Sequence, residues 1–137
     1  MSLNQLPSAS AHAHIGHEHY QTTITSAGHT LIADEPASSM GTDLGMSPYS
    51  LLLSSLGSCT AITLRMYADR KMWVVDSISV KLDLYRVNAD TIIEREITFT
   101  GNLTDEQRNR MLTIANSCPV HQILTGNIDI KTSLAGT

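Results

Sequence analysis

The fold of this chain is decided by residues 47–71, which read SPYSLLLSSLGSCTAITLRMYADRK. Ser47 is a favoured N-cap residue and Pro48 suits the first helical position, so we expect a helix from there to about Lys71. Its apolar residues recur at spacings of three and four, and others fill the remaining faces. The pattern predicts a central helix that is buried nearly all round. A small domain rarely encloses such a helix alone, which favours a homodimer with a shared core.

Composition and charge exclude several classes of partner. The chain has 137 residues and a formal net charge of -4. Its first Lys or Arg is Arg65, and these cations form no cluster dense enough for phosphates, so we expect no nucleic acid partner. The uncharged run 44–64 contains too many Ser, Thr and Gly residues for a membrane span. The sequence shows neither a secretory signal nor a disulfide framework, so the expected location is the cytoplasm.

The rest of the sequence predicts an α+β fold in which hairpins flank the helices. Residues 1–16 lack an apolar period and are expected to be a flexible leader, followed by a single domain over 17–137. Alternation and turn residues predict strands at 20–25, 29–33, 75–87, 91–100 and 128–134, with a loop over 34–45. A capping box predicts a helix from the N-cap Thr104 to about Asn116.

The two longest predicted strands should each have one buried face. In the strand over 75–87, Ile, Val and Leu side chains alternate with polar ones. In the strand over 91–100, Ile93, Arg95 and Ile97 share one face. Because successive side chains of a strand point to opposite sides, one face of this hairpin should be buried and the other wet.

The chain has two cysteines, and both stand where a thiol can react. Cys59 lies inside the central helix, and Cys118 comes directly before Pro119. Since proline is tolerated at the first helical position, a short helix should begin at Cys118, whose thiol would then face the positive helix end. That environment lowers a thiol pKa. The alternative is that both are small buried apolar residues.

Three segments carry a resemblance to a known family: Ser47-Pro48-Tyr49-Ser50-Leu51-Leu52-Leu53, Leu56-Gly57-Ser58-Cys59-Thr60 and Cys118-Pro119-Val120-His121. In their order and context they resemble the OsmC/Ohr family of intertwined α+β homodimers. The resemblance implies a peroxidase that reduces small hydrophobic peroxides, in which Cys59 attacks and becomes a sulfenic acid. Cys118 would then resolve it as a disulfide, which an external dithiol reductant reopens. No cofactor is expected.

The sequence also departs from the family pattern. The resemblance implies an arginine ahead of the central helix, and a glutamate after its proline, that together support the attacking thiolate. Here no arginine precedes Arg65, and Tyr49 follows Pro48. Without a nearby cation, Cys59 should attack slowly.

Four other side chains are possible substitutes for the missing pair. They are His29, Glu35, Tyr49 and His121. His121 follows Cys118 at a spacing that shares one helix face, so it is a candidate base or partner.

Two further interpretations stay open at this point. The first is a dimer without turnover that binds a small hydrophobic ligand, with both cysteines as packing residues. The second concerns the histidine-rich segment that holds His12, His14, His17 and His19. Its histidines are potential metal ligands. However, the segment is terminal and has few carboxylates or thiols nearby, so we expect it to be solvated and predict no metal site.

Overall fold

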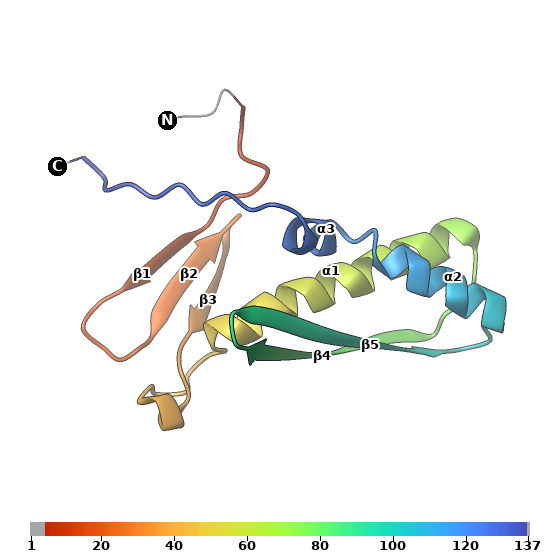
Figure 1. Cartoon of the computed structure of the whole chain (residues 1–137), viewed down its shortest axis with the longest axis horizontal. Coiled ribbons are helices and arrows are strands. Elements are labelled where there is room, and N and C mark those ends of the chain that lie inside the picture. The colour runs from red at the N-terminus through yellow and green to blue at the C-terminus, as the bar shows by residue number, and fades with distance from the viewer. Residues whose placement is uncertain (1–4, 137) are drawn as a thin grey trace. The chain divides into compact units, whose positions relative to one another are not determined.

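The computed structural model describes residues 5–136 and confirms the predicted α+β class (Figure 1). The chain divides into two compact units, Met1–Leu52 and Leu53–Thr137. Helix α1 (Pro48–Lys71) begins in the first unit and continues through the second. The assignment of 17–137 to a single domain stays a prediction. Within the described residues, no helix is long and apolar enough to cross a membrane.

A three-stranded antiparallel sheet forms the first unit. Its order is β1 (His12–Ile15), β2 (Thr22–Ser26) and β3 (His29–Ala33). The β2–β3 hairpin matches the prediction, and its turn residues Ala27 and Gly28 have φ angles of 50° and 82°. Since positive φ angles suit the two-residue turns of twisted hairpins, this turn fixes the register of the strands.

Strand β1 corrects the expectation that nothing is structured before Gly16. His12–Ile15 pairs with β2 although all four of its residues are exposed. An edge strand is held by backbone hydrogen bonds, which need no apolar period, so the side-chain pattern did not reveal it.

A buried carboxylate organises the predicted loop after β3. Asp34 is 2% exposed and accepts hydrogen bonds from the backbone N–H groups of Tyr20, Glu35, Thr42 and Leu44, and from the Thr42 hydroxyl. The bond from Thr42 and these backbone donors hold the pKa of the Asp34 carboxyl well below its usual range. The loop includes a short 3₁₀ helix, η1 (Ala37–Ser39). Asp34 therefore replaces the regular backbone pairing that this segment lacks.

The second unit places α1 against a long hairpin and a second helix. Strands β4 (Ser77–Val87) and β5 (Asp90–Thr100) pair antiparallel, and they run along α1 in Figure 1. Helix α2 (Asp105–Ala115) starts with the predicted capping box between Thr104 and Gln107. The buried core consists of Leu64, Tyr67, Ala68, Val75, Met111 and Ala115.

Helix α1 has the predicted bounds but not the predicted burial. Ser47 caps it by accepting a hydrogen bond from the Ser50 backbone N–H. Leu64 and Ala68 are fully buried, whereas Ile62 is 54% and Met66 is 67% exposed. The prediction of a helix buried all round is therefore wrong for a single chain, because one hairpin and one helix cover only part of its surface.

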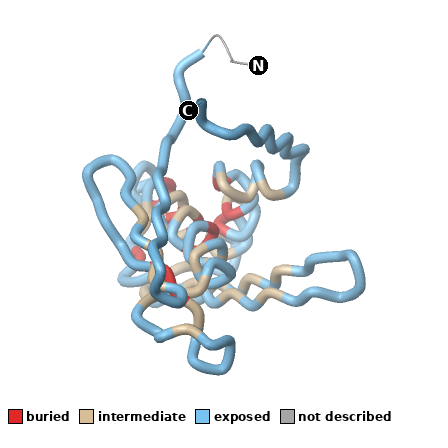
Figure 2. The backbone as a smooth tube through the Cα atoms, turned by 90° about the vertical axis from the view of Figure 1, so that its left-hand side faces the viewer, coloured by how far each residue is buried: buried red, intermediate tan, exposed pale blue. Residues whose placement is uncertain are grey.

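The C-terminal part of the chain contains one confirmed helix and one strand that does not form. Helix α3 (Pro119–Thr125) has Cys118 as its N-cap and Pro119 in its first turn, as predicted. The expected strand at 128–134 is wrong, since this segment has no regular structure and is exposed along its length (Figure 2). A strand needs a neighbour for its backbone groups, and within residues 5–136 this segment pairs with none.

Candidate active site

The two cysteines meet in the second unit as free thiols. Cys59 lies on α1 and is partly exposed, while Cys118 stands at the start of α3 and is fully buried. Each thiol shifts the pKa of the other, so the two side chains lie close together. Two sulfurs far apart in the sequence are therefore close enough to influence one another's ionisation.

A tight connection between α2 and α3 brings Cys118 to this place. Its backbone N–H donates to the Ala115 carbonyl over 3.4 Å, and its own carbonyl accepts from the Gln122 backbone N–H over 3.0 Å. Met111 and Ala115 anchor α2 in the core with no exposed surface. Cys118 is therefore tied to both helices through its backbone.

The surroundings of the two sulfurs differ, and so do the directions of their pKa shifts. Burial and the hydrogen bond with Cys118 raise the pKa of Cys59. Burial alone would also raise the pKa of Cys118, but hydrogen bonds from Cys59, from the His121 and Val120 backbone N–H groups and from Thr60 together lower it. Of the two thiols, Cys118 is therefore the one whose thiolate form its surroundings favour. This direction agrees with the expectation from the helix start.

An arginine stands beside the thiol pair. Arg95 on β5 donates to the Thr60 hydroxyl oxygen over 3.0 Å and to the Asn116 side-chain oxygen over 3.1 Å. Thr60 is fully buried, its hydroxyl donates to the Leu56 carbonyl over 2.7 Å, and it is one of the groups that lower the pKa of Cys118. No carboxylate within residues 5–136 forms a salt bridge with Arg95. Its charge is therefore not neutralised by a neighbouring acid and favours an anion nearby.

His121 joins the same network through both its backbone and its ring. Its backbone N–H is one of the Cys118 donors, and its Nδ1 lies 3.2 Å from a terminal nitrogen of Arg95. Because arginine can only donate, Nδ1 must accept, which places the ring hydrogen on Nε2. The structure places His121 beside Cys118, and its role as a base or partner stays a prediction.

The other predicted supporting residues lie outside the unit that holds the two thiols. His29, Glu35 and Tyr49 belong to the first unit, so their part in the site stays a prediction. Arg65 donates to the Val75 carbonyl over 2.8 Å, which occupies that guanidinium at the far end of α1. No three His, Cys, Asp or Glu side chains in the described part of the chain are grouped to hold a metal.

Sequence reasoning missed Arg95, although a signal for it was present. It alternates in phase with Ile93 and Ile97, and all three are partly buried. A charged residue on the buried face of a strand needs a polar partner, which here is the Thr60 and Asn116 pair. The network of Arg95, Thr60, Asn116 and His121 is called the Arg95 network below.

This fold and this site define an α+β protein with a paired-thiol centre. A family model described as OsmC-like protein matches residues 41–133. The chain belongs to the OsmC-like protein family, as the resemblance of its cysteine segments implied.

Solved structures confirm the fold. A protein from Psychrobacter arcticus described as an osmotic stress induced and detoxification response protein has a TM-score of 0.73 at 18% identity, over 90% of this chain and 91% of that one. An OsmC like protein from Mycoplasma pneumoniae has a TM-score of 0.70 at 20% identity, over 88% and 89%. An organic hydroperoxide resistance protein OsmC from Legionella pneumophila has a TM-score of 0.64 at 21% identity, over 93% and 96%. No curated protein matches the chain.

Proposed function

We propose that this protein reduces organic hydroperoxides through Cys59 and Cys118, with an external dithiol as reductant. The observation that carries the proposal is the proximity of the two free thiols, with Arg95 bound to Thr60 beside Cys118. Membership of the OsmC-like family and the fold shared with a hydroperoxide resistance protein support a role related to peroxides. The Arg95 network offers a cation in place of the arginine that the sequence lacks ahead of α1.

The reaction begins at Cys59, because it is the more exposed of the two sulfurs. As the hydroperoxide approaches, the Cys59 S–H passes its proton to the Cys118 thiolate, and the Cys59 sulfur attacks the terminal oxygen. An S–O bond forms while the O–O bond breaks, which leaves a sulfenic acid on Cys59 and an alkoxide. Cys118 returns the proton to the alkoxide, which leaves as an alcohol.

The second step uses the recovered Cys118 thiolate. Its sulfur attacks the sulfenic sulfur of Cys59, an S–S bond forms, and hydroxide leaves and takes a proton from solvent to become water. Arg95 acts as a positioning residue in both steps, since it donates to Thr60, which borders Cys118. A dithiol then reopens the disulfide by thiolate exchange.

The proposal is tested by treating the reduced protein with cumene hydroperoxide and counting free thiols. Wild type should lose both thiols in one intramolecular disulfide, and dithiothreitol should restore them. Cys59→Ser should keep its remaining thiol. Cys118→Ser should accumulate a sulfenic acid that dimedone traps. Inert thiols in wild type, or equal turnover in Cys59→Ser, would overturn the proposal and favour the ligand-binding alternative.

We also propose that the active form is a homodimer. Ile62 and Met66 are four residues apart on α1, so they share one helix face, and both are largely exposed. A second copy of the chain that packs on this face would bury these exposed apolar residues of α1, as the apolar pattern of the helix predicts. Light scattering coupled to gel filtration measures the mass. A dimer in wild type and a monomer in Ile62→Asp is the expected outcome, and a monomeric wild type would contradict it.

A further inference from the structure

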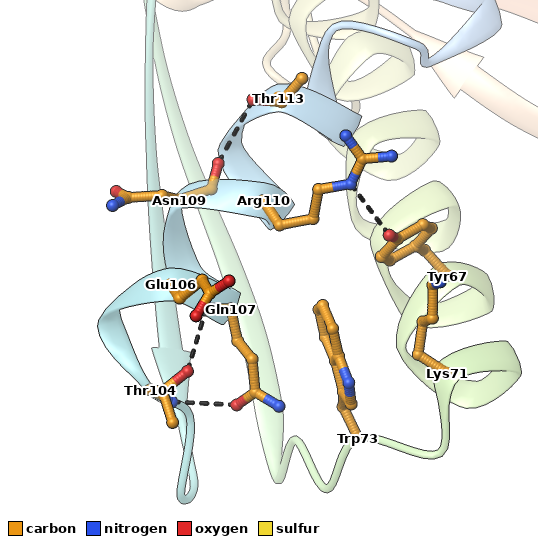
Figure 3. A pocket seen from close by; sticks show the side chains of 9 residues that line it. All are labelled: Tyr67, Lys71, Trp73, Thr104, Glu106, Gln107, Asn109, Arg110 and Thr113. Carbon is orange, nitrogen blue, oxygen red and sulfur yellow. Dashed lines mark hydrogen bonds between the residues drawn. The ribbon is translucent and has the colours of Figure 1, made fainter.

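A cavity of about 660 Å³ lies in the second unit between the C-terminal end of α1 and helix α2 (Figure 3). Its volume falls within the usual range for small-molecule sites. Neither cysteine lines it, and Tyr67, its nearest lining residue on α1, comes eight residues after Cys59. The cavity is thus separate from the thiol pair.

Two aromatic rings give the cavity an apolar wall. Tyr67 is 6% exposed, and its ring meets that of Trp73 edge to face, with centroids 5.6 Å apart and planes at 75°. Trp73 is partly exposed and stands between α1 and α2 in Figure 3. A flat apolar group entering the cavity would find the exposed part of the Trp73 ring to pack against.

Three cations surround the Tyr67 ring in a protein whose net charge is negative. The charged groups of Arg70, Lys71 and Arg110 lie 5.6, 5.7 and 5.8 Å from its centroid. Arg70 and Lys71 occupy the last turn of α1, where cations offset the helix dipole. Arg110 lies in the middle of α2, so that explanation does not apply to it.

A single hydrogen bond orients Arg110. Its Nε donates to the Tyr67 hydroxyl over 3.0 Å, and this bond with the nearby positive charge lowers the pKa of Tyr67. No group within residues 5–136 accepts a hydrogen bond from its two terminal nitrogens. Glu106, the one carboxylate that lines the cavity, forms no salt bridge with any described cation. The terminal nitrogens are therefore free for a planar, doubly accepting anion.

We propose that this cavity binds a small organic carboxylate that carries a flat apolar ring. The carboxylate accepts from the Arg110 terminal nitrogens, with Lys71 as a second cation, and the ring packs on Trp73. This site goes beyond the proposed redox function, because it involves neither cysteine.

Trp73 is the only tryptophan of the chain, so its fluorescence reports on this cavity alone. Titration with 3-phenylpropionate should change the emission saturably and raise the unfolding temperature as the ligand concentration increases. 3-Phenylpropionamide, which has the ring without the charge, should bind at least about tenfold more weakly, since hydrogen bonds to a charged group contribute roughly 1.5–3 kcal/mol. Inorganic phosphate, which has the charge without the ring, should also bind more weakly.

The variant Arg110→Gln should weaken 3-phenylpropionate binding by about tenfold or more. Arg108→Gln is the matched control, because it removes the same charge from the same helix outside the cavity and should bind like wild type. Circular dichroism checks that both variants fold, and Arg110→Lys should bind with intermediate affinity if Arg110→Gln does not fold. No saturable signal in wild type, equal binding of the amide or of phosphate, or equal weakening in Arg108→Gln would overturn the proposal.

Discussion

The guanidinium of Arg95 donates a 3.0 Å hydrogen bond to the hydroxyl oxygen of Thr60. Thr60 in turn is one of the groups that lower the pKa of Cys118, so Arg95 holds a side chain that borders this thiol. The family resemblance implies an arginine ahead of the central helix, which this sequence lacks. The Arg95 network instead borders Cys118, from a strand that follows the central helix in the sequence.

Replacing Arg95 should slow the reaction with peroxide. We expect Arg95→Gln to lower the rate of thiol loss with cumene hydroperoxide by about tenfold, because Thr60 beside Cys118 loses the charged donor that holds it. Arg86→Gln removes an equal charge from the exposed end of the same hairpin and should react like wild type. Stopped-flow thiol titration gives both rates. Equal slowing in the two variants would show that only the overall charge matters.

The two thiols should change each other's titration in opposite directions. The hydrogen bond from Cys59 lowers the pKa of Cys118, so Cys59→Ala should raise the pKa of Cys118. The hydrogen bond with Cys118 raises the pKa of Cys59, so Cys118→Ala should lower the pKa of Cys59. The pH dependence of alkylation by iodoacetamide measures the remaining thiol in each variant. If both substitutions shifted the pKa of the remaining thiol in the same direction, the opposite effects assigned here to Cys59 and Cys118 would be wrong.

Asp34 should make stability depend on acidity. The pKa of its carboxyl lies below the ordinary value of 3.8 in the folded chain, so its stabilising contribution is present above that value and is lost as the pH falls below it. Asp34→Asn places an amide N–H₂ among hydrogen-bond donors and should lower the unfolding temperature at neutral pH by several degrees. It should also weaken the dependence of stability on pH in acid. Asp43→Asn, an exposed acid of the same loop, is the matched control for thermal denaturation.

Gly45 should not tolerate a side chain. A Cβ atom at this position would collide with the Ile32 carbonyl group, which belongs to the backbone and cannot turn aside. Gly45→Ala should therefore destabilise the loop that Asp34 organises and lower the unfolding temperature. At Gly16 a Cβ atom would meet nothing within 4 Å, so Gly16→Ala should unfold like wild type. Equal melting curves for the two variants would contradict this account of the loop.

Much of the fold could be predicted because its signals are local. The N-cap Ser47, the capping box at Thr104 and the Cys118-Pro119 pair each fix a helix start through neighbouring residues, and all three are confirmed. The predictions of an all-round buried α1 and of a strand at 128–134 were wrong, because each depends on which neighbours pack against the segment. An apolar or extended pattern shows that a segment suits a neighbour, not that one chain supplies it.

The candidate site could be predicted in part. The meeting of Cys59 and Cys118 followed from the family resemblance, and His121 followed from its spacing to Cys118. Arg95 did not, because its contact with Thr60 joins residues 35 positions apart. Alternation along β5 pointed its side chain inward, but only the packing of β5 against α1 shows which polar group it meets.

Thr60 has one hydroxyl hydrogen, and two possible acceptors lie beside it, the Leu56 carbonyl and the Cys118 sulfur. The hydroxyl donates to the Leu56 carbonyl over 2.7 Å, and a Cys118 thiolate beside it would be a stronger acceptor. While the pair is reduced, these two acceptors compete for the same proton. Once the sulfurs are joined as a disulfide, no thiolate can form, so the hydroxyl hydrogen stays with the Leu56 carbonyl in α1.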